Sequence, residues 1–84
     1  GLVWKAVDDD RLMAEAGALA RSLATGPTRA YGLIKRALDA SETSTLDAQL
    51  DLERDLQREA GFSADYREGV AAFLQKRKPA FKGK

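Results

Sequence analysis

Residues 68–81 read Glu68-Gly69-Val70-Ala71-Ala72-Phe73-Leu74-Gln75-Lys76-Arg77-Lys78-Pro79-Ala80-Phe81. The first part of this stretch has the composition of a helix, and Pro79 ends it because proline cannot donate the next hydrogen bond. Phe73 and Lys76 are three residues apart, so on a helix an aromatic face and an ammonium group point toward the same ligand. An adenine ring stacked on Phe73 and a phosphate bound by Lys76 would together form a nucleotide contact.

A second interpretation of the same stretch assigns no ligand to it. Phe73 would then be a core residue, and the lysines would form a solvated helix end whose positive charge complements the helix dipole. From the spacing alone this second interpretation is the favoured one.

The charge of the chain is unevenly distributed around this stretch. Residues 75–84 contain five basic residues and no acidic one, whereas residues 1–74 contain 13 acidic and 9 basic residues. The C-terminal end is therefore an anion-attracting patch on a negatively charged body. Five clustered charges are a weak signal for nucleic-acid binding, and the negative body argues against it.

The rest of the sequence predicts an all-α fold. Apolar residues recur at helical spacing in four segments, at about residues 9–25, 28–41, 45–60 and 64–77. Residues 1–7 are rich in β-branched and aromatic types and too few for a helix, which predicts an extended segment. No later segment alternates with a period of two, so no sheet is expected within these residues.

Local signals mark the ends of the predicted helices. Gly26-Pro27 stops the first helix, since glycine suits the position after a helix and proline cannot continue it. Ser44, with Asp47 three residues later, resembles a capping box, and Ser63 is expected to cap the last helix. Gly32 costs about 1 kcal/mol relative to alanine inside a helix, which predicts close packing against it.

The third predicted helix has polar residues within its apolar face. Gln49, Glu53 and Gln57 share the arc of the leucines. This pattern indicates either a wide apolar face whose edges are solvated or a helix that contacts two surfaces, one of them polar. For Glu53 a structural role, paired with an arginine or backbone donors, is favoured over a catalytic one, which would need burial to raise its pKa.

Several classes of chemistry are excluded within these residues. The chain has no cysteine and no histidine, so it contains no disulfide, thiolate nucleophile, imidazole base or metal ligand of those types. Phosphate-binding glycine loops and the nucleophile elbow are also missing from the sequence. No apolar run is long enough to span a bilayer or to act as a signal peptide. We therefore expect no catalytic residue and no metal site in this segment.

Residues 68–81 resemble the closing helix of the crotonase superfamily, the enoyl-CoA hydratases and isomerases, which ends approximately E-G-x-x-A-F-x-E-K-R-x-P-x-F. Gln75 departs from the usual glutamate in that pattern. Residues 1–3 and the acidic helix start at Asp8 resemble the passage from the core of that fold into its C-terminal helices. Pro27 followed by Lys35 also fits, so the resemblance covers essentially the whole chain.

Two further stretches are similar to one branch of that superfamily. Residues 50–53 and 57–61 look most like the enzymes that isomerise the ring epoxide of phenylacetyl-CoA, in phenylacetate degradation.

The resemblance implies a larger, two-part protein. An N-terminal core, not present here, would hold the acyl-CoA site, with two backbone N–H groups as an oxyanion hole and one or two carboxylates as acid and base. Residues 1–7 would connect to that core. Residues 8–84 would form the four-helix C-terminal oligomerisation domain of the crotonase fold. In relatives the phenylalanine and lysine of the closing helix reach the nucleotide part of CoA bound to a neighbouring subunit. These positions fall on Phe73 and Lys76, which reverses the preference stated above.

The expected function is therefore trimer formation and completion of the CoA pocket in an enoyl-CoA hydratase or isomerase of the cytoplasm, with fatty-acid metabolism as the general setting. The implied assembly is a homotrimer or a dimer of trimers. The acyl-CoA thioester is the substrate, and no separate cofactor, nucleic acid or membrane is expected. Gly1 in place of methionine indicates a processed chain or a piece of a larger one, expected to be inactive alone. The alternative is a free-standing helical interaction module with no enzymatic parent.

Overall fold

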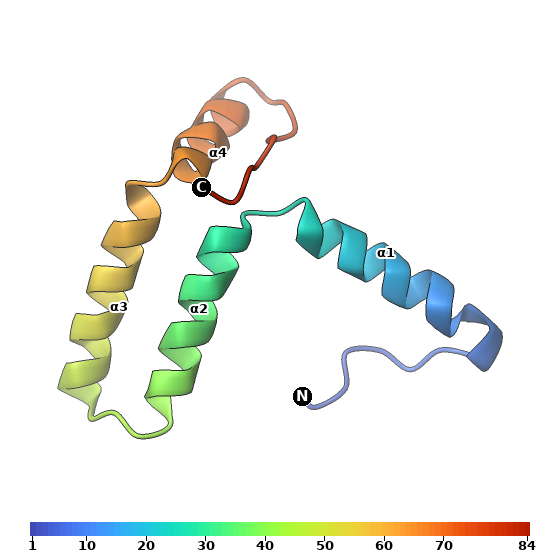
Figure 1. The fold of residues 1–84 in the computed structure, drawn as a ribbon, viewed down its shortest axis with the longest axis horizontal. Coiled ribbons are helices and arrows are strands. Elements are labelled where there is room, and N and C mark those ends of the chain that lie inside the picture. Colours follow the sequence, from blue (N-terminus) through green and yellow to red (C-terminus); the bar gives the residue numbers. More distant parts are fainter.

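The computed structural model describes all 84 residues and contains helices without any strand. A short 3-10 turn, η1 (Asp9–Arg11), leads into α1 (Leu12–Ala24), followed by α2 (Thr28–Ser41), α3 (Leu46–Gly61) and α4 (Ala64–Leu74). The first residues of the chain are not helical (Figure 1). The all-α prediction is confirmed.

Helices α2 and α3 form an antiparallel hairpin, which holds most of the small core (Figure 1). Leu33 of α2 and Leu56 of α3 are 7% and 6% exposed, and they are the only large apolar side chains that are buried. Gln49 of α3 donates a hydrogen bond of 3.0 Å to the carbonyl oxygen of Ala37 across the hairpin. A polar residue on the apolar arc of α3 is therefore used to join the two helices.

Two expectations about the hairpin are wrong in detail. Thr45, and not Ser44, is the N-cap of α3, and its hydroxyl oxygen accepts a hydrogen bond from the amide of Ala48. Gly32 packs closely against nothing, because a Cβ added there would find no heavy atom within 4 Å. Within this chain, the glycine in α2 faces open space.

The molecule is much more open than a globular domain of its size. Its radius of gyration is 16.1 Å, whereas a compact chain of this length has about 12 Å. Its accessible surface is 7164 Å², against about 4,900 Å² expected for a folded monomer of this mass. No residue of α1 is buried, and this helix leads away from the hairpin (Figure 1).

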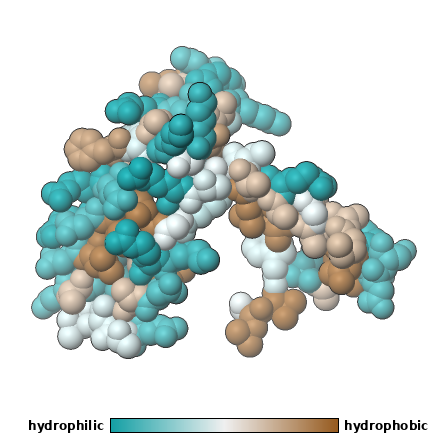
Figure 2. Space-filling view, in the orientation of Figure 1, coloured by the Kyte–Doolittle hydropathy of each residue, from teal (hydrophilic) through white to brown (hydrophobic).

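The extra surface is largely apolar. Figure 2 shows hydrophobic side chains exposed between α2 and α3, along α1 and at the N-terminal end. Leu2 and Trp4 are 103% and 85% exposed, and Leu38 of α2 is 62% exposed. Exposed apolar area of this extent is typical of surfaces that bind another protein segment, a ligand or a membrane.

Helix α4 begins as the sequence predicts and ends earlier. The Ser63 hydroxyl oxygen accepts a hydrogen bond of 3.0 Å from the amide of Tyr66, so the predicted cap is confirmed. The helix ends at Leu74, three residues before the predicted end. The amides of Lys76 and Arg77 donate to the carbonyl oxygens of Phe73 and Ala72, and Lys76 has a φ of 53°. These are the two hydrogen bonds and the left-handed residue of a Schellman motif.

Residues 75–84, which we call the tail, then run back along α4 and are held by two of its carboxylates. Asp65 is 4% exposed, and it accepts hydrogen bonds of 2.7 and 2.8 Å from the amides of Lys82 and Gly83. Glu68 accepts from the Arg77 guanidinium and from the Ala80 amide. These contacts bring the chain end back beside the start of α4 (Figure 1).

Close approaches explain two of the glycines. A Cβ on Gly83, whose φ is +71°, would lie 2.6 Å from the Thr28 hydroxyl oxygen, so the tail packs tightly on the first residue of α2. A Cβ on Gly26 would lie 2.8 Å from the ring carbon Cζ of Tyr31. Gly26 is therefore required by the neighbouring tyrosine, and its backbone is not left-handed.

We predict that the stability contributed by Glu68 is lost in acid. The Arg77 guanidinium, and then the Ala80 amide, lower the pKa of Glu68 from 4.5 to about 2. Because the folded-state pKa lies below the unfolded one, this contribution is fully present above about pH 4.5 and disappears as the pH falls toward 2. The difference in denaturation midpoint between the protein and Glu68→Gln should shrink over that interval.

Glu42→Gln is the control for this titration, since Glu42 is exposed and forms no ion pair within 4.0 Å. A gap between the protein and Glu68→Gln that stays constant from pH 5 to pH 2 would contradict the proposed role of the carboxylate charge.

We also predict that the isolated 84-residue chain self-associates, because its apolar faces lack cover. Sedimentation velocity should show a weight-average mass that rises with concentration. Leu38→Gln should weaken this association, whereas Lys35→Gln on the same helix, which removes no apolar surface, should weaken it less. A monomer at every concentration would show that the exposed faces need no partner.

Candidate functional site

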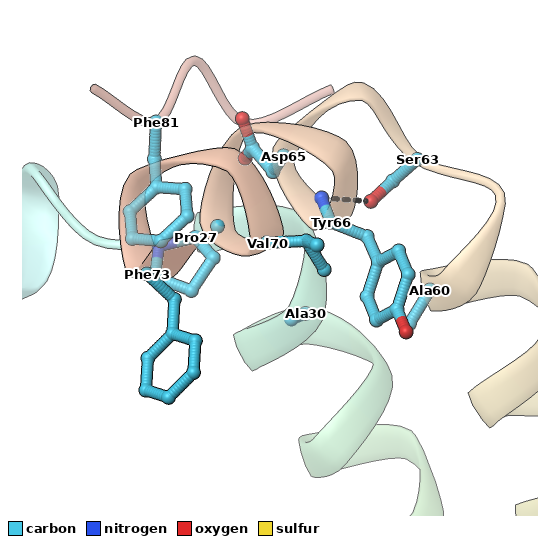
Figure 3. A pocket seen from close by; sticks show the side chains of 10 residues that line it. Pro27, Ala30, Ala60, Ser63, Asp65, Tyr66, Val70, Phe73 and Phe81 are labelled. Carbon is cyan, nitrogen blue, oxygen red and sulfur yellow. Dashed lines mark hydrogen bonds between the residues drawn. The ribbon is translucent and has the colours of Figure 1, made fainter. Parts of the chain in front are cut away.

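An apolar groove lies where α4, the start of α2 and the tail meet (Figure 3). Its volume is about 360 Å³. The apolar side chains that line it come from α4, the start of α2, the end of α3 and the tail: Tyr66, Val70, Phe73, Pro27, Ala30, Ala60 and Phe81. The tail therefore contributes one aromatic side chain, Phe81, to the groove.

Phe81 packs beside Gly69 of α4. A Cβ on Gly69 would lie 3.5 Å from Cε1 of Phe81, which is an ordinary contact, so the position of the ring does not require glycine here. The hydrogen bonds of Ala80 to Glu68 and of Lys82 to Asp65 hold the residues on either side of this ring. By binding these backbone amides, the two carboxylates position the Phe81 ring along the groove.

Phe73 is 82% exposed at the edge of this groove. In Figure 3 its ring points away from Phe81 and out of the helix. The interpretation that places Phe73 in the core is wrong for this chain. An exposed aromatic ring beside an apolar groove offers a flat face for stacking.

Lys76 lies next to Phe73 but not on the same helix. The amide of Lys76 donates a hydrogen bond of 3.2 Å to the Phe73 carbonyl oxygen, in the turn that follows α4. The expected spacing on one helical face is replaced by this turn. The Lys76 side chain is exposed and has no carboxylate within 4.0 Å, so its ammonium group is free to meet an anion.

The positive charge of the tail is only partly neutralised. Arg77 pairs with Glu68 at 2.6 Å, and the hydrogen bond from Arg77 to Glu68 raises the pKa of Arg77 above its usual value. The other four basic residues of the tail form no ion pair: Lys76, Lys78, Lys82 and Lys84. The tail therefore keeps an excess of positive charge beside the groove.

Sequence reasoning missed the most buried carboxylate of the chain. Asp65 occupies the first turn of α4, where acidic residues are common for reasons of the helix dipole alone. Asp65 holds the tail only because Lys82, 17 residues later in the chain, lies beside it, and no local sequence pattern predicts this contact. The only available signal was the charge contrast between the basic tail and the acidic residues of α4.

Glu53, the acidic residue singled out on α3, has a modest role. Its side chain is exposed and accepts a hydrogen bond of 2.9 Å from Gln49. No arginine lies within 4.0 Å of it.

No three acidic residues come together in a way that could hold a metal ion. None of the helices is both long enough and apolar enough to cross a bilayer.

Comparison with known proteins places these residues in a family. The model of the enoyl-CoA hydratase/isomerase family matches residues 1–84. A protein of Escherichia coli K12 named 1,2-epoxyphenylacetyl-CoA isomerase is 63% identical over the whole chain, which covers 32% of that protein. A probable enoyl-CoA hydratase of Rhodobacter capsulatus is 49% identical, again over the whole chain and 33% of the relative.

A solved structure agrees with the sequence matches. The crystal structure of an enoyl-CoA hydratase from Geobacillus kaustophilus HTA426 superposes with a TM-score of 0.89 at 33% identity, over 100% of this chain and 32% of that one. The chain thus spans about a third of the length of the relatives it matches. These residues belong to the enoyl-CoA hydratase/isomerase family, and their four helices are part of its crotonase fold.

Proposed function

We propose that these residues are the C-terminal helical domain of an enoyl-CoA hydratase or isomerase, where they assemble the trimer and complete the pocket for the acyl-CoA substrate. The observation that carries this proposal is the exposed Phe73 ring at the edge of the groove, followed three residues later by Lys76, which forms no ion pair, in the turn after α4. The family match favours this function over a free-standing interaction module.

The assembly part of the proposal rests on surface area. The chain exposes about 2,300 Å² more than a compact monomer of its mass would expose. A standard protein–protein interface buries about 800 Å² on each partner, so this excess exceeds one such interface. We propose that the rest of the same polypeptide covers one part of it and neighbouring subunits of a homotrimer cover another.

The CoA part of the proposal rests on chemical complementarity. Coenzyme A ends in an adenine ring with phosphates attached to its ribose. An exposed aromatic ring such as Phe73 stacks on a base, which contributes about 1–3 kcal/mol. The C-terminus of a helix repels anions through its dipole, so a phosphate near the end of α4 needs cations. Lys76 and the other unpaired tail lysines supply them.

The reacting groups of the enzyme are proposed to lie outside these residues, in the part of the relatives that this chain does not span. There a pair of backbone N–H groups would stabilise a thioester enolate, with carboxylates as acid and base. The name of the 63% identical relative supports a ring-epoxide phenylacetyl-CoA as substrate. CoA enters as part of the substrate, no further cofactor is proposed, and the cytoplasm is the proposed site of action.

The isolated 84-residue chain is predicted to be inactive, because the oxyanion hole and the catalytic carboxylates are proposed to lie outside it. Incubation with crotonyl-CoA, followed through the absorbance of the conjugated thioester, should show no hydration above the uncatalysed rate. A full-length enoyl-CoA hydratase is the positive control, and hydration by the isolated chain would refute the proposal that the reacting groups lie outside these residues.

In the full-length enzyme, substitutions of the two contact residues should raise KM more than they lower kcat, since they remove binding shared by ground and transition states. Lys76→Met is expected to raise KM for acyl-CoA about two- to fivefold, the value of an exposed ion pair. Phe73→Ala should raise it about fivefold or more. Added salt should diminish the Lys76 effect.

Lys35→Met is the matched control for these measurements, because it removes an exposed cation of α2 that forms no ion pair. Unchanged kinetics in both Phe73→Ala and Lys76→Met would refute the CoA contact.

A further inference from the structure

Lys76 adopts a backbone conformation that lysine disfavours. Its φ of 53° makes it the only residue other than glycine with a positive φ. Glycine is the usual residue at this position after a helix, and a side chain here costs on the order of 1 kcal/mol. No packing or ion pair of the Lys76 side chain compensates for this cost, since the side chain is exposed and unpaired. Strain of this kind persists only where the surrounding structure imposes it.

The competing conformation is a longer helix. Lysine, arginine and glutamine are good helix formers, and the apolar pattern continues to Arg77, where Pro79 finally stops it. A helix continued to residue 77 would therefore satisfy every local preference. In the structure the chain turns at Lys76 instead, two residues after α4 ends.

Glu68 distinguishes between these two conformations. In the observed turn, Nη1 and Nη2 of Arg77 donate to the two carboxylate oxygens of Glu68 at 2.6 and 3.0 Å. In a continued helix, Arg77 would lie nine residues from Glu68, about 13.5 Å along the axis and on the opposite side. The ion pair therefore exists only when the chain turns.

The same carboxylate also holds the chain beyond the turn. The Ala80 amide donates a hydrogen bond of 2.8 Å to Oε1 of Glu68. Glu68 thus binds Arg77, which directly follows Lys76, and Ala80, three residues further along the chain. Its side chain is 25% exposed, so solvent competes for these bonds less than at the open surface.

We propose that Glu68 is a positioning residue for the phosphate contact of Lys76: by binding Arg77 and the Ala80 amide, it keeps α4 from extending and holds Lys76 in the left-handed turn. The proposal rests on the function proposed for Lys76. Glu68 itself touches no ligand, and its charge is neutralised by Arg77, so it presents little repulsion to a nearby phosphate.

A double-mutant cycle in the full-length enzyme tests this. Glu68→Gln, Lys76→Met and the double variant are compared by KM and kcat with an acyl-CoA substrate and by calorimetric titration with free coenzyme A. Glu68→Gln alone is expected to raise KM and the Kd for coenzyme A about two- to fivefold, with kcat within twofold of the parent. In the Lys76→Met background the same substitution should change neither constant.

Two results would overturn the proposal while leaving the function of Lys76 intact. One is that Glu68→Gln raises KM and Kd equally in the parent and in the Lys76→Met background, which would mean that Glu68 affects CoA binding independently of Lys76. The other is a Lys76→Met defect with no Glu68→Gln defect. If Lys76→Met itself has no effect, the phosphate contact proposed for Lys76 fails, and the Glu68 proposal fails with it.

Two further variants separate positioning from general loss of structure. Glu59→Gln breaks a comparable exposed ion pair, with Arg29 at 3.1 Å, and should leave KM unchanged. Arg77→Gln removes the guanidinium that Glu68 binds and should raise KM at least as much as Glu68→Gln does. Failure of Arg77→Gln to do so would overturn the proposal even if Glu68→Gln does not fold.

Discussion

The attachment of the basic tail to two carboxylates of α4 is the interaction on which the candidate site depends. Asp65 and Glu68 lie three residues apart in α4 and together accept hydrogen bonds from three tail amides and the Arg77 guanidinium. They hold the residues on either side of Phe81, which lines the groove. Charge-assisted hydrogen bonds of this type are roughly twice as strong as neutral ones, which suits a short segment with little apolar surface of its own.

The tail and α4 are joined by many hydrogen bonds, whereas the rest of the molecule buries little apolar surface. Around the hairpin only Leu33 and Leu56 are buried among the large apolar side chains, and α1 buries none of its residues. A chain that buries so little apolar area gains little hydrophobic stabilisation against its conformational entropy. The four helices therefore depend on surfaces beyond these residues, consistent with a chain that spans a third of its relatives.

Local signals in the sequence predicted a large part of the architecture. Apolar periodicity located all four helices, and Ser63 was recognised as a cap because its residue type and position suffice to identify it. The end of α4 was not predictable in this way, because Lys76 and Arg77 prefer a helix and turn only when Glu68 binds the chain. For Phe73 the spacing favoured a core position, and only the family resemblance favoured the prediction of a CoA contact.

The sequence by itself determined the helical class and the positive charge of the tail, since apolar spacing and composition carry these properties along the chain. It also identified the family, through the resemblance of residues 68–81 to its closing helix. The tertiary structure alone decided that Asp65 is buried, that Phe73 is exposed and that Lys76 occupies a left-handed turn. For Asp65 and Lys76 the physical reason is the same. These properties depend on contacts between residues up to 18 positions apart, where a carboxylate meets backbone amides whose position no local preference specifies.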